Sequence, residues 1–229
     1  LFILIGISCS AELKAQKNGT VYKGNDPAVR YTGRTLVSPD GSVAFDWVGT
    51  YLETRFTGGK LSVKVSETGT SYYNVFVDGK LHKVVKVCGT DTLIHLVSGI
   101  DKRIHSLKIQ KRSEGEFGKT TVHQFVLSGS GRLAEEPAVR TRHIELIGNS
   151  LTCGYGTDGK HRDEPFLVET ENCNLTFASM VARYYDADYT LIAHSGRGAA
   201  RNYGDSVRVS KVTMKDRMLN TFDEDLTHK

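Results

Sequence analysis

The sequence predicts a multidomain protein in which an all-β sandwich is followed by an incomplete α/β domain. Three observations support this prediction. Runs that alternate apolar and polar residues follow one another between residues 21 and 127, the chain has 23 Gly against 4 Pro, and a strand–loop–helix–strand pattern begins only after residue 141. Period-two alternation is typical of strands, and glycines suit the tight turns between them. At 229 residues the chain is long enough for both parts.

The first residues have the composition of a targeting segment. Leu1 to Ile7 form an apolar run as long as a signal-peptide core and too short to span a bilayer. We therefore predict that residues 1–16 are a partial signal segment outside the fold, and that the protein is secreted, periplasmic or at the cell surface. No membrane span is expected, while Cys9 leaves a lipid anchor open. A buried first strand is the alternative interpretation.

Strands are expected through most of residues 17–132, the predicted sandwich domain. They cover residues 44–48, 51–56, 61–65, 72–77, 92–97, 105–111 and 122–127. Asp78-Gly79 predicts a two-residue hairpin, because both central positions of such a turn need a positive φ. Many short strands without a helical pattern among them are typical of a jelly roll.

The pattern changes after a connector at residues 133–140, which contains Glu135-Glu136-Pro137. A strand is expected at 142–147, a helix near 175–185 and a second strand at 189–193. This β–α–β order marks the beginning of an α/β domain, which we place at residues 141–229. The spacing of Met214, Met218, Leu219 and Phe222 is compatible with one more helix.

Two loops follow the two strands of this unit. Gly148-Asn149-Ser150 follows the first strand, and Ser195-Gly196-Arg197-Gly198 follows the second. A right-handed crossover makes such strands parallel, so both loops emerge at the same edge of the sheet. A serine hydroxyl is a nucleophile, and glycines let backbone N–H groups turn toward a developing oxyanion. The arrangement predicts an acyl-transfer site, although a plain strand-ending turn is the alternative for the first triplet alone.

Residues 147–156, Ile-Gly-Asn-Ser-Leu-Thr-Cys-Gly-Tyr-Gly, resemble the first sequence block of the SGNH, or GDSL-type, hydrolases. Residues 194–198, His-Ser-Gly-Arg-Gly, resemble their second block. With the β-rich first domain and Arg201-Asn202-Tyr203 after the second block, the chain is similar to carbohydrate esterase family two. The resemblance implies a jelly roll fused to a three-layer, flavodoxin-like SGNH domain. It also implies removal of O-acetyl groups from plant polysaccharides such as xylan and glucomannan.

The resemblance assigns roles to single residues. Ser150 would be the nucleophile and its own N–H the first oxyanion donor, with the N–H of Gly196 as the second. Asn149 stands where the family usually has Asp, and its amide can still brace the turn. Tyr155 and Asn202 flank the two blocks, and we predict that they line the acetyl or sugar pocket.

The family's third block and its catalytic histidine have no counterpart before Lys229. We therefore expect the base, and a third oxyanion donor, beyond the C-terminus of this chain. His194 and His228 are the less favoured alternatives. A serine without a base is a poor nucleophile at neutral pH, so this chain alone should be nearly inactive.

Other chemistries have less support. The net charge of +4 is scattered, so nucleic acid is not an expected partner. No Cys-x-x-Cys pair occurs, and neither a metal nor a cofactor is predicted. Cys153 and Cys173 are the cysteines most expected to pair. Two other functions stay open: an SGNH lipase or thioesterase acting on a non-sugar ester, and a non-catalytic carbohydrate-binding protein with a decayed hydrolase domain.

Overall fold

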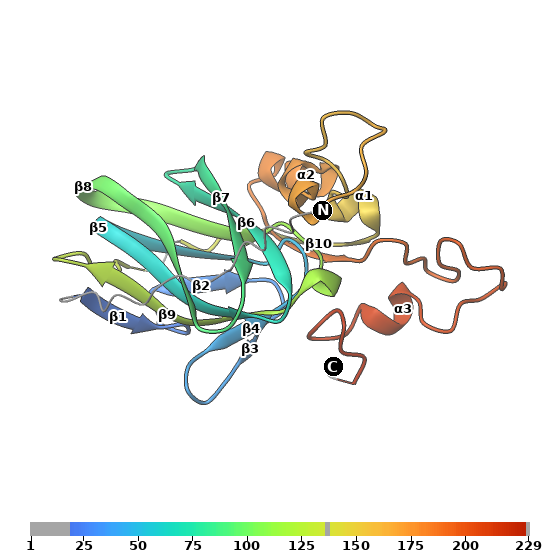
Figure 1. Ribbon diagram of the computed structural model, residues 1–229, viewed down its shortest axis with the longest axis horizontal. Helices are drawn as coiled ribbons and strands as arrows, with labels where there is room; N and C mark the ends of the chain where they lie inside the picture. The colour runs from blue at the N-terminus through green and yellow to red at the C-terminus, as the bar shows by residue number, and fades with distance from the viewer. Residues whose placement is uncertain (1–18, 136–137, 228–229) are drawn as a thin grey trace, which may run out of the picture.

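The computed structural model describes residues 19–135 and 138–227. The predicted signal segment, with Cys9, lies outside these residues, as does His228. Nine strands form one strongly curved antiparallel sheet (Figure 1). They are β1 (Gly19–Lys23), β2 (Val29–Thr32), β3 (Leu36–Val37), β4 (Val43–Phe45), β5 (Tyr51–Glu67), β6 (Thr70–Val77), β7 (Lys80–Cys88), β8 (Thr92–Lys111) and β9 (Thr120–Ser128).

Two long strands build the first domain. The first half of β5 pairs with β2 and β8, and its second half pairs with β9 and β8. The sheet therefore folds over itself around one apolar core, which includes Phe56, Leu61 and Leu127, each fully buried. The predicted β-rich jelly-roll domain is confirmed. The hairpin at Asp78-Gly79 is also present, with φ values of 50° and 74°.

The sequence pattern divided these long strands wrongly. Residues 51–56 and 61–65 were predicted as separate strands but are both parts of β5, and residues 92–97 and 105–111 are both parts of β8. Gly58 and Gly59, which lie between the two predicted strands, are the site of register shifts within β5 and not of a turn. A Cβ atom on Gly58 would lie 2.4 Å from the carbonyl oxygen of Asp101. Glycine here permits a close strand crossing, and the strand continues through it.

The second part of the chain contains a two-stranded parallel sheet. Strand β10 (His143–Gly148) pairs with β11 (Asp188–Ala193), in the parallel direction that the sequence predicted. Between them lie α1 (Ser150–Cys153), the 3-10 turns η2 (Val168–Thr170) and η3 (Cys173–Leu175), and α2 (Phe177–Tyr184). A third helix, α3 (Met214–Arg217), is only four residues long and does not extend to Phe222.

The predicted pairing of Cys153 with Cys173 is wrong, because both cysteines are free and buried. Each thiol has another partner. The Cys173 thiol donates to the backbone carbonyl of Lys111 at 3.4 Å, and Cys153 lies beside the carboxyl group of Glu114.

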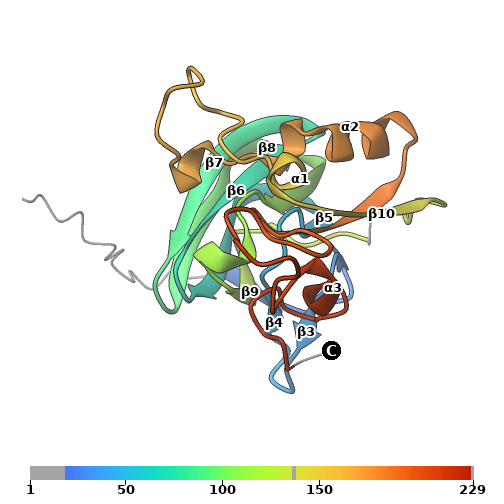
Figure 2. The same ribbon diagram turned by 90° about the vertical axis from the view of Figure 1, so that its right-hand side faces the viewer.

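The second part packs directly on the sandwich, as Figure 2 shows from the side of α2 and β10. Tyr51 from β5 shares a core with Ala182 and Tyr189. Trp47 is fully buried against Ile192 and Met214 in a third core. These cores contain side chains from both parts of the chain. The packing therefore does not show where one domain ends and the next begins, and the boundaries at 132 and 141 stay predictions. No helix in residues 19–135 and 138–227 is long and apolar enough to cross a bilayer.

Candidate active site

Ser150 is the first residue of helix α1 and comes two residues after the end of β10. A Cβ atom on Gly148 would lie 2.0 Å from the hydroxyl oxygen of Thr152, so only glycine fits this turn. The side-chain oxygen of Asn149 caps the helix by accepting a hydrogen bond from the N–H of Leu151 at 3.2 Å. The amide of Asn149 therefore braces the serine turn.

The second loop starts directly after β11. Gly196 has a φ of 73°, a left-handed conformation that favours glycine. Its carbonyl accepts a hydrogen bond from the N–H of Tyr203 at 2.8 Å. The Asn202 side chain accepts from the N–H of Gly198 and donates to the carbonyl of Val212. These bonds close residues 195–203 into a compact loop, which Asn202 braces from within.

Both loops face the same cavity of about 720 Å³. Its lining residues are Glu116, Asn149, Ser150, Tyr155, Ser195, Gly196, Arg197, Gly198, Arg201 and Tyr203. Ser150, Gly196 and Tyr155 thus meet at one site, while Asn202 lines an adjoining hollow of about 390 Å³ that also contains Gly196. The ring of Tyr155 stacks on Phe166, with 3.7 Å between ring centroids.

Two backbone donors at this cavity are unused. Within the described part of the chain, neither the N–H of Ser150 nor that of Gly196 donates a hydrogen bond. For Ser150 the reason is general, since the first N–H groups of a helix have no intrahelical partner. The site therefore combines a hydroxyl with two free N–H groups, the set of groups that an oxyanion site requires.

One wall of the cavity was not anticipated from the sequence. Glu116 belongs to the 3-10 turn η1 (Gly115–Phe117), which joins strands of the sandwich. Burial and the neighbouring Glu114 raise the pKa of Glu116 above its usual value. Nothing in the Glu-Gly-Glu sequence separates such a turn from an ordinary solvated one, so the signal exists only in three dimensions.

No histidine lines the cavity among the described residues. His194 directly precedes the loop of residues 195–203, called the glycine loop below. Its side chain is buried, 3% exposed, and its Nδ1 lies 2.7 Å from a carboxylate oxygen of Asp223. Its Nε2 lies 3.7 Å from Glu116. Burial opposes the charged ring, but the hydrogen bond to Asp223 and the adjacent carboxylates raise the pKa of His194 overall. The imidazole is thus engaged in a buried ion pair.

Comparison with known proteins shows which family the sandwich is similar to. Residues 31–137 match the family model described as carbohydrate esterase 2 N-terminal. The resemblance of the chain to carbohydrate esterase family two is confirmed.

Individual relatives extend the similarity past this domain. The cellulase/esterase CelE of Acetivibrio thermocellus is 33% identical over 180 residues, which cover 79% of this chain and 22% of that protein. An acetylxylan esterase / glucomannan deacetylase of Cellvibrio japonicus is 31% identical over 199 residues, covering 84% of this chain and 54% of that protein. The chain therefore spans about half or less of the length of these relatives.

A solved structure gives the same result in three dimensions. A family two carbohydrate esterase from Clostridium thermocellum, solved in complex with cellohexaose, aligns with a TM-score of 0.79 at 32% identity. The alignment covers 84% of this chain and 58% of that structure. An alignment over 84% of this chain extends past the sandwich into the second part.

Proposed function

We propose that this chain carries the nucleophile and oxyanion part of a serine esterase that removes O-acetyl groups from plant cell-wall polysaccharides. The observation that supports the proposal best is the convergence of Ser150 and Gly196 on one cavity from the ends of two adjacent parallel strands. The names of the relatives, which include acetylxylan esterase and glucomannan deacetylase, favour acetylated xylan or glucomannan as the substrate.

The proposed reaction proceeds through an acetyl-enzyme. The Ser150 hydroxyl loses its proton to a base as its oxygen attacks the acetyl carbonyl carbon. The N–H groups of Ser150 and Gly196 hold the oxyanion that forms on the carbonyl oxygen. The intermediate collapses, the sugar oxygen leaves and takes up a proton, and water then releases acetate from Ser150.

The same proposal covers the fold of residues 141–229. A parallel strand pair with the nucleophile after the first strand and a glycine loop after the second is the order expected for the start of a three-layer SGNH hydrolase domain. Secretion to the cell surface or periplasm belongs to the proposal as well, since polysaccharide substrates of this size stay outside the cell.

Because no histidine lines the cavity in the described residues, we expect slow hydrolysis by the 229-residue chain alone. Imidazole added to the solution can replace a missing general base. We expect acetate release from acetylated glucomannan or xylan to rise with imidazole concentration, and Ser150→Ala to abolish that rise. Thr152→Ser, at a buried position of the same helix, is the matched control and should retain it.

The substrate class is tested in the same assay with a lysophospholipid ester in place of the polysaccharide. Faster Ser150-dependent hydrolysis of the lipid would contradict the polysaccharide assignment and favour a lipase or thioesterase. Equal imidazole-dependent rates for the wild type and Ser150→Ala would overturn Ser150 as the nucleophile.

A second function is favoured by one observation, the lack of a histidine at the cavity within residues 19–135 and 138–227. The chain would then bind carbohydrate without cleaving it, using the exposed Tyr155 beside the cavity as a stacking surface. Calorimetric binding of cellohexaose that Tyr155→Ala weakens, together with no imidazole-dependent activity, would support this function over catalysis.

A further inference from the structure

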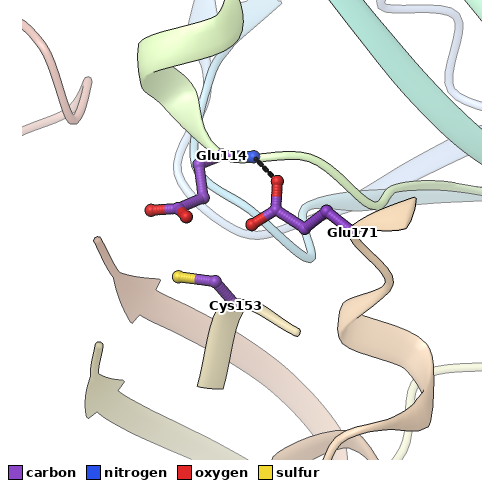
Figure 3. Close-up of side chains that lie close together, drawn as sticks. All are labelled: Glu114, Cys153 and Glu171. Carbon is purple, nitrogen blue, oxygen red and sulfur yellow. Dashed lines mark hydrogen bonds between the residues drawn. The ribbon is translucent and has the colours of Figure 1, made fainter. Parts of the chain in front are cut away.

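Three buried titratable side chains, two carboxyl groups and one thiol, lie together beside the glycine loop: Glu114, Cys153 and Glu171 (Figure 3). Each is 0% exposed. They come from three segments, namely the residue before η1, the end of α1 and the stretch between η2 and η3. Their oxygen and sulfur atoms lie within 4.8 Å of one another, and neither the sandwich nor the second part of the chain holds all three.

The carboxylate of Glu114 reaches from the sandwich to the glycine loop. One of its oxygens accepts a hydrogen bond from the N–H of Ser195 at 2.5 Å, and the other accepts from the Ser195 hydroxyl. Ser195 directly precedes Gly196, the proposed oxyanion donor. A side chain outside the α/β unit therefore holds both polar groups of the residue that fixes the direction of the Gly196 N–H.

If Glu171 were ionised, one of its two carboxylate oxygens would lack a hydrogen-bond donor among the described residues. Its Oε2 accepts the N–H of Glu114 at 3.0 Å. Its Oε1 is buried without a hydrogen-bond partner in the part of the chain that the structure describes. Figure 3 shows this carboxyl group facing Glu114 and Cys153. A buried carboxylate oxygen without a donor is costly, whereas a carboxylic acid could donate its own proton to a neighbour.

The local charges favour one proton on this pair of carboxyl groups. Two ionised carboxylates this close together in a dry site repel each other. The ammonium group of Lys111, fully buried nearby, donates to the hydroxyl of Ser71 at 2.7 Å and to the backbone carbonyl of Glu114 at 3.3 Å. Burial lowers the pKa of Lys111, and Glu67 and Asp46 act on its charge more strongly than Glu171 does, so this cation does not offset a second ionised carboxyl group at the cluster.

The hydrogen bonds decide which group carries the proton. Both oxygens of Glu114 already accept from Ser195, which suits a carboxylate. Glu171 has the free oxygen, and burial together with Glu114 raises its pKa to about 10. Burial also raises the pKa of the Cys153 thiol, so this group is a neutral thiol beside Glu114.

We infer that Glu171 is a neutral carboxylic acid that donates a hydrogen bond to Glu114, and that the Glu114 carboxylate is thereby fixed as a positioning residue for the Ser195–Gly196 loop. The positioning role in catalysis rests on the proposed esterase function, whereas the proton on Glu171 does not. A carboxylate offers about four acceptor positions, and Ser195, Glu171 and the Cys153 thiol together can fill them.

The first experiment detects the proton. The chain is labelled with ¹³C at the glutamate carboxyl carbons, and the carboxyl resonances are followed from about pH 5 to about pH 11. We expect one resonance to titrate near the pKa of about 10 and to be absent from Glu171→Gln. Glu169→Gln, an exposed position two residues earlier, is the matched control and should retain the resonance.

Two results would overturn this part. One is a Glu171 resonance that titrates in the ordinary range of about 4 to 5. The other is a metal ion present at one equivalent in elemental analysis of the purified chain and lost in Cys153→Ala.

The second experiment tests the positioning role. In amide spectra of the chain, the short hydrogen bond to Glu114 should shift the Ser195 N–H resonance strongly downfield, and Glu114→Gln should reverse much of that shift and move the Gly196 resonance with it. Ser195→Ala keeps the backbone donor and should preserve the amide bond, so it remains informative if Glu114→Gln folds poorly. Unmoved Ser195 and Gly196 resonances in folded Glu114→Gln would overturn the positioning role.

The catalytic consequence is read from imidazole-dependent acetate release. Glu114→Gln should lower kcat by about 10-fold to 100-fold with little change in KM, because a displaced oxyanion donor acts on the transition state. No Ser150-dependent release by the wild type would remove the proposed function while the two spectroscopic results still stand. Full activity in a Glu114→Gln variant whose loop resonances have moved would overturn the catalytic role alone.

Discussion

Two glycines of the chain share one backbone conformation but have different surroundings. Gly49 and Gly79 have φ values of 75° and 74°. A Cβ atom on Gly79 would meet nothing within 4 Å, whereas one on Gly49 would lie 2.7 Å from the Cδ1 atom of Leu191. Gly49 therefore marks the place where the sandwich backbone touches strand β11.

This pair gives a matched prediction about stability. Gly79→Ala should lower the free energy of unfolding by about 1 kcal/mol, the cost of a left-handed backbone for alanine. Gly49→Ala carries the same cost plus overpacking against Leu191, and should lose about 2 to 4 kcal/mol. Urea denaturation measures both values. Equal losses at the two sites would contradict the tight contact with β11.

The sequence predicted residues whose role is local and missed those whose role depends on a distant segment. Ser150 and Gly196 follow strands and stand in recognisable motifs, so their meeting at one cavity followed from the parallel crossover. Glu114 and Glu116 become part of the site only because residues 113–117 pack against a loop about 80 positions later. No spacing rule connects such positions.

At the scale of elements, the end of β11 is tied to the last described segment by a cluster of charged side chains around His194 and Asp223. Asp223 accepts hydrogen bonds from His194 and from Arg217, at 2.7 and 3.0 Å. The carboxyl groups of Glu116 and Glu224 also lie within 4 Å of the His194 ring. The segment after α3 is thus held to the sheet by charge as well as by packing.

The ion pair predicts a pH dependence of stability. Because the folded-state pKa of His194 is raised, its stabilising contribution is complete below the unfolded value of about 6.5 and is lost as pH rises through the folded value. The difference in unfolding free energy between wild type and His194→Gln should therefore shrink by up to about 1.4 kcal/mol per pH unit above that point.

Urea unfolding of both proteins between about pH 6 and about pH 9 measures this difference. His161→Gln, at an exposed ring, is the control and should show no such trend. A gap between wild type and His194→Gln that is constant over the range would contradict the buried ion pair.

Element boundaries were predicted less well than element types, and β5 shows why. Period-two alternation identifies a strand but carries no information on whether a glycine pair ends it. At Gly59 the chain meets the backbone of Ser128 on the opposite strand, 2.9 Å from where a Cβ would stand. The pairing partners on both sides keep the strand intact, and that information is absent from the local sequence.

At the scale of the whole molecule, Asp188 joins the two parts electrostatically. Its carboxylate, 5% exposed, accepts hydrogen bonds from Arg30 at 2.6 Å, from the Tyr51 hydroxyl at 2.7 Å and from Arg140 at 2.8 Å. Arg30 and Tyr51 belong to the sandwich, while Asp188 begins β11. Burial opposes the charge, yet these donors hold the pKa of Asp188 well below its usual value.

Asp188→Asn should lower the free energy of unfolding by about 2 kcal/mol at neutral pH, because the partly buried guanidinium groups of Arg30 and Arg140 lose one carboxylate and keep only Glu53 as a common partner. The sign of the pH dependence follows from the lowered pKa: the contribution is present above about pH 4 and is lost as pH falls. Wild type should therefore lose more stability than Asp188→Asn on acidification.

Asp186→Asn provides the control for this prediction, because Asp186 is 89% exposed and contacts only the Arg140 partner of the same network. Chemical denaturation at about pH 7 and about pH 2.5, on the two sides of the ordinary aspartate pKa, compares the three proteins. Equal stability of Asp186→Asn and Asp188→Asn would contradict a role of the network in joining the two parts.

The carboxyl groups of Glu114 and Glu116 also limit how the sandwich and the second part can be exchanged between proteins. The sandwich supplies Glu114 to the glycine loop and Glu116 to the cavity wall. A chimera that exchanges the sandwich for an unrelated domain would remove both groups even if the second part still folded. The two parts therefore cannot be exchanged independently. A graft that keeps the contacts of Glu114 and Glu116 must carry the turn at 113–117 along with residues 141–229.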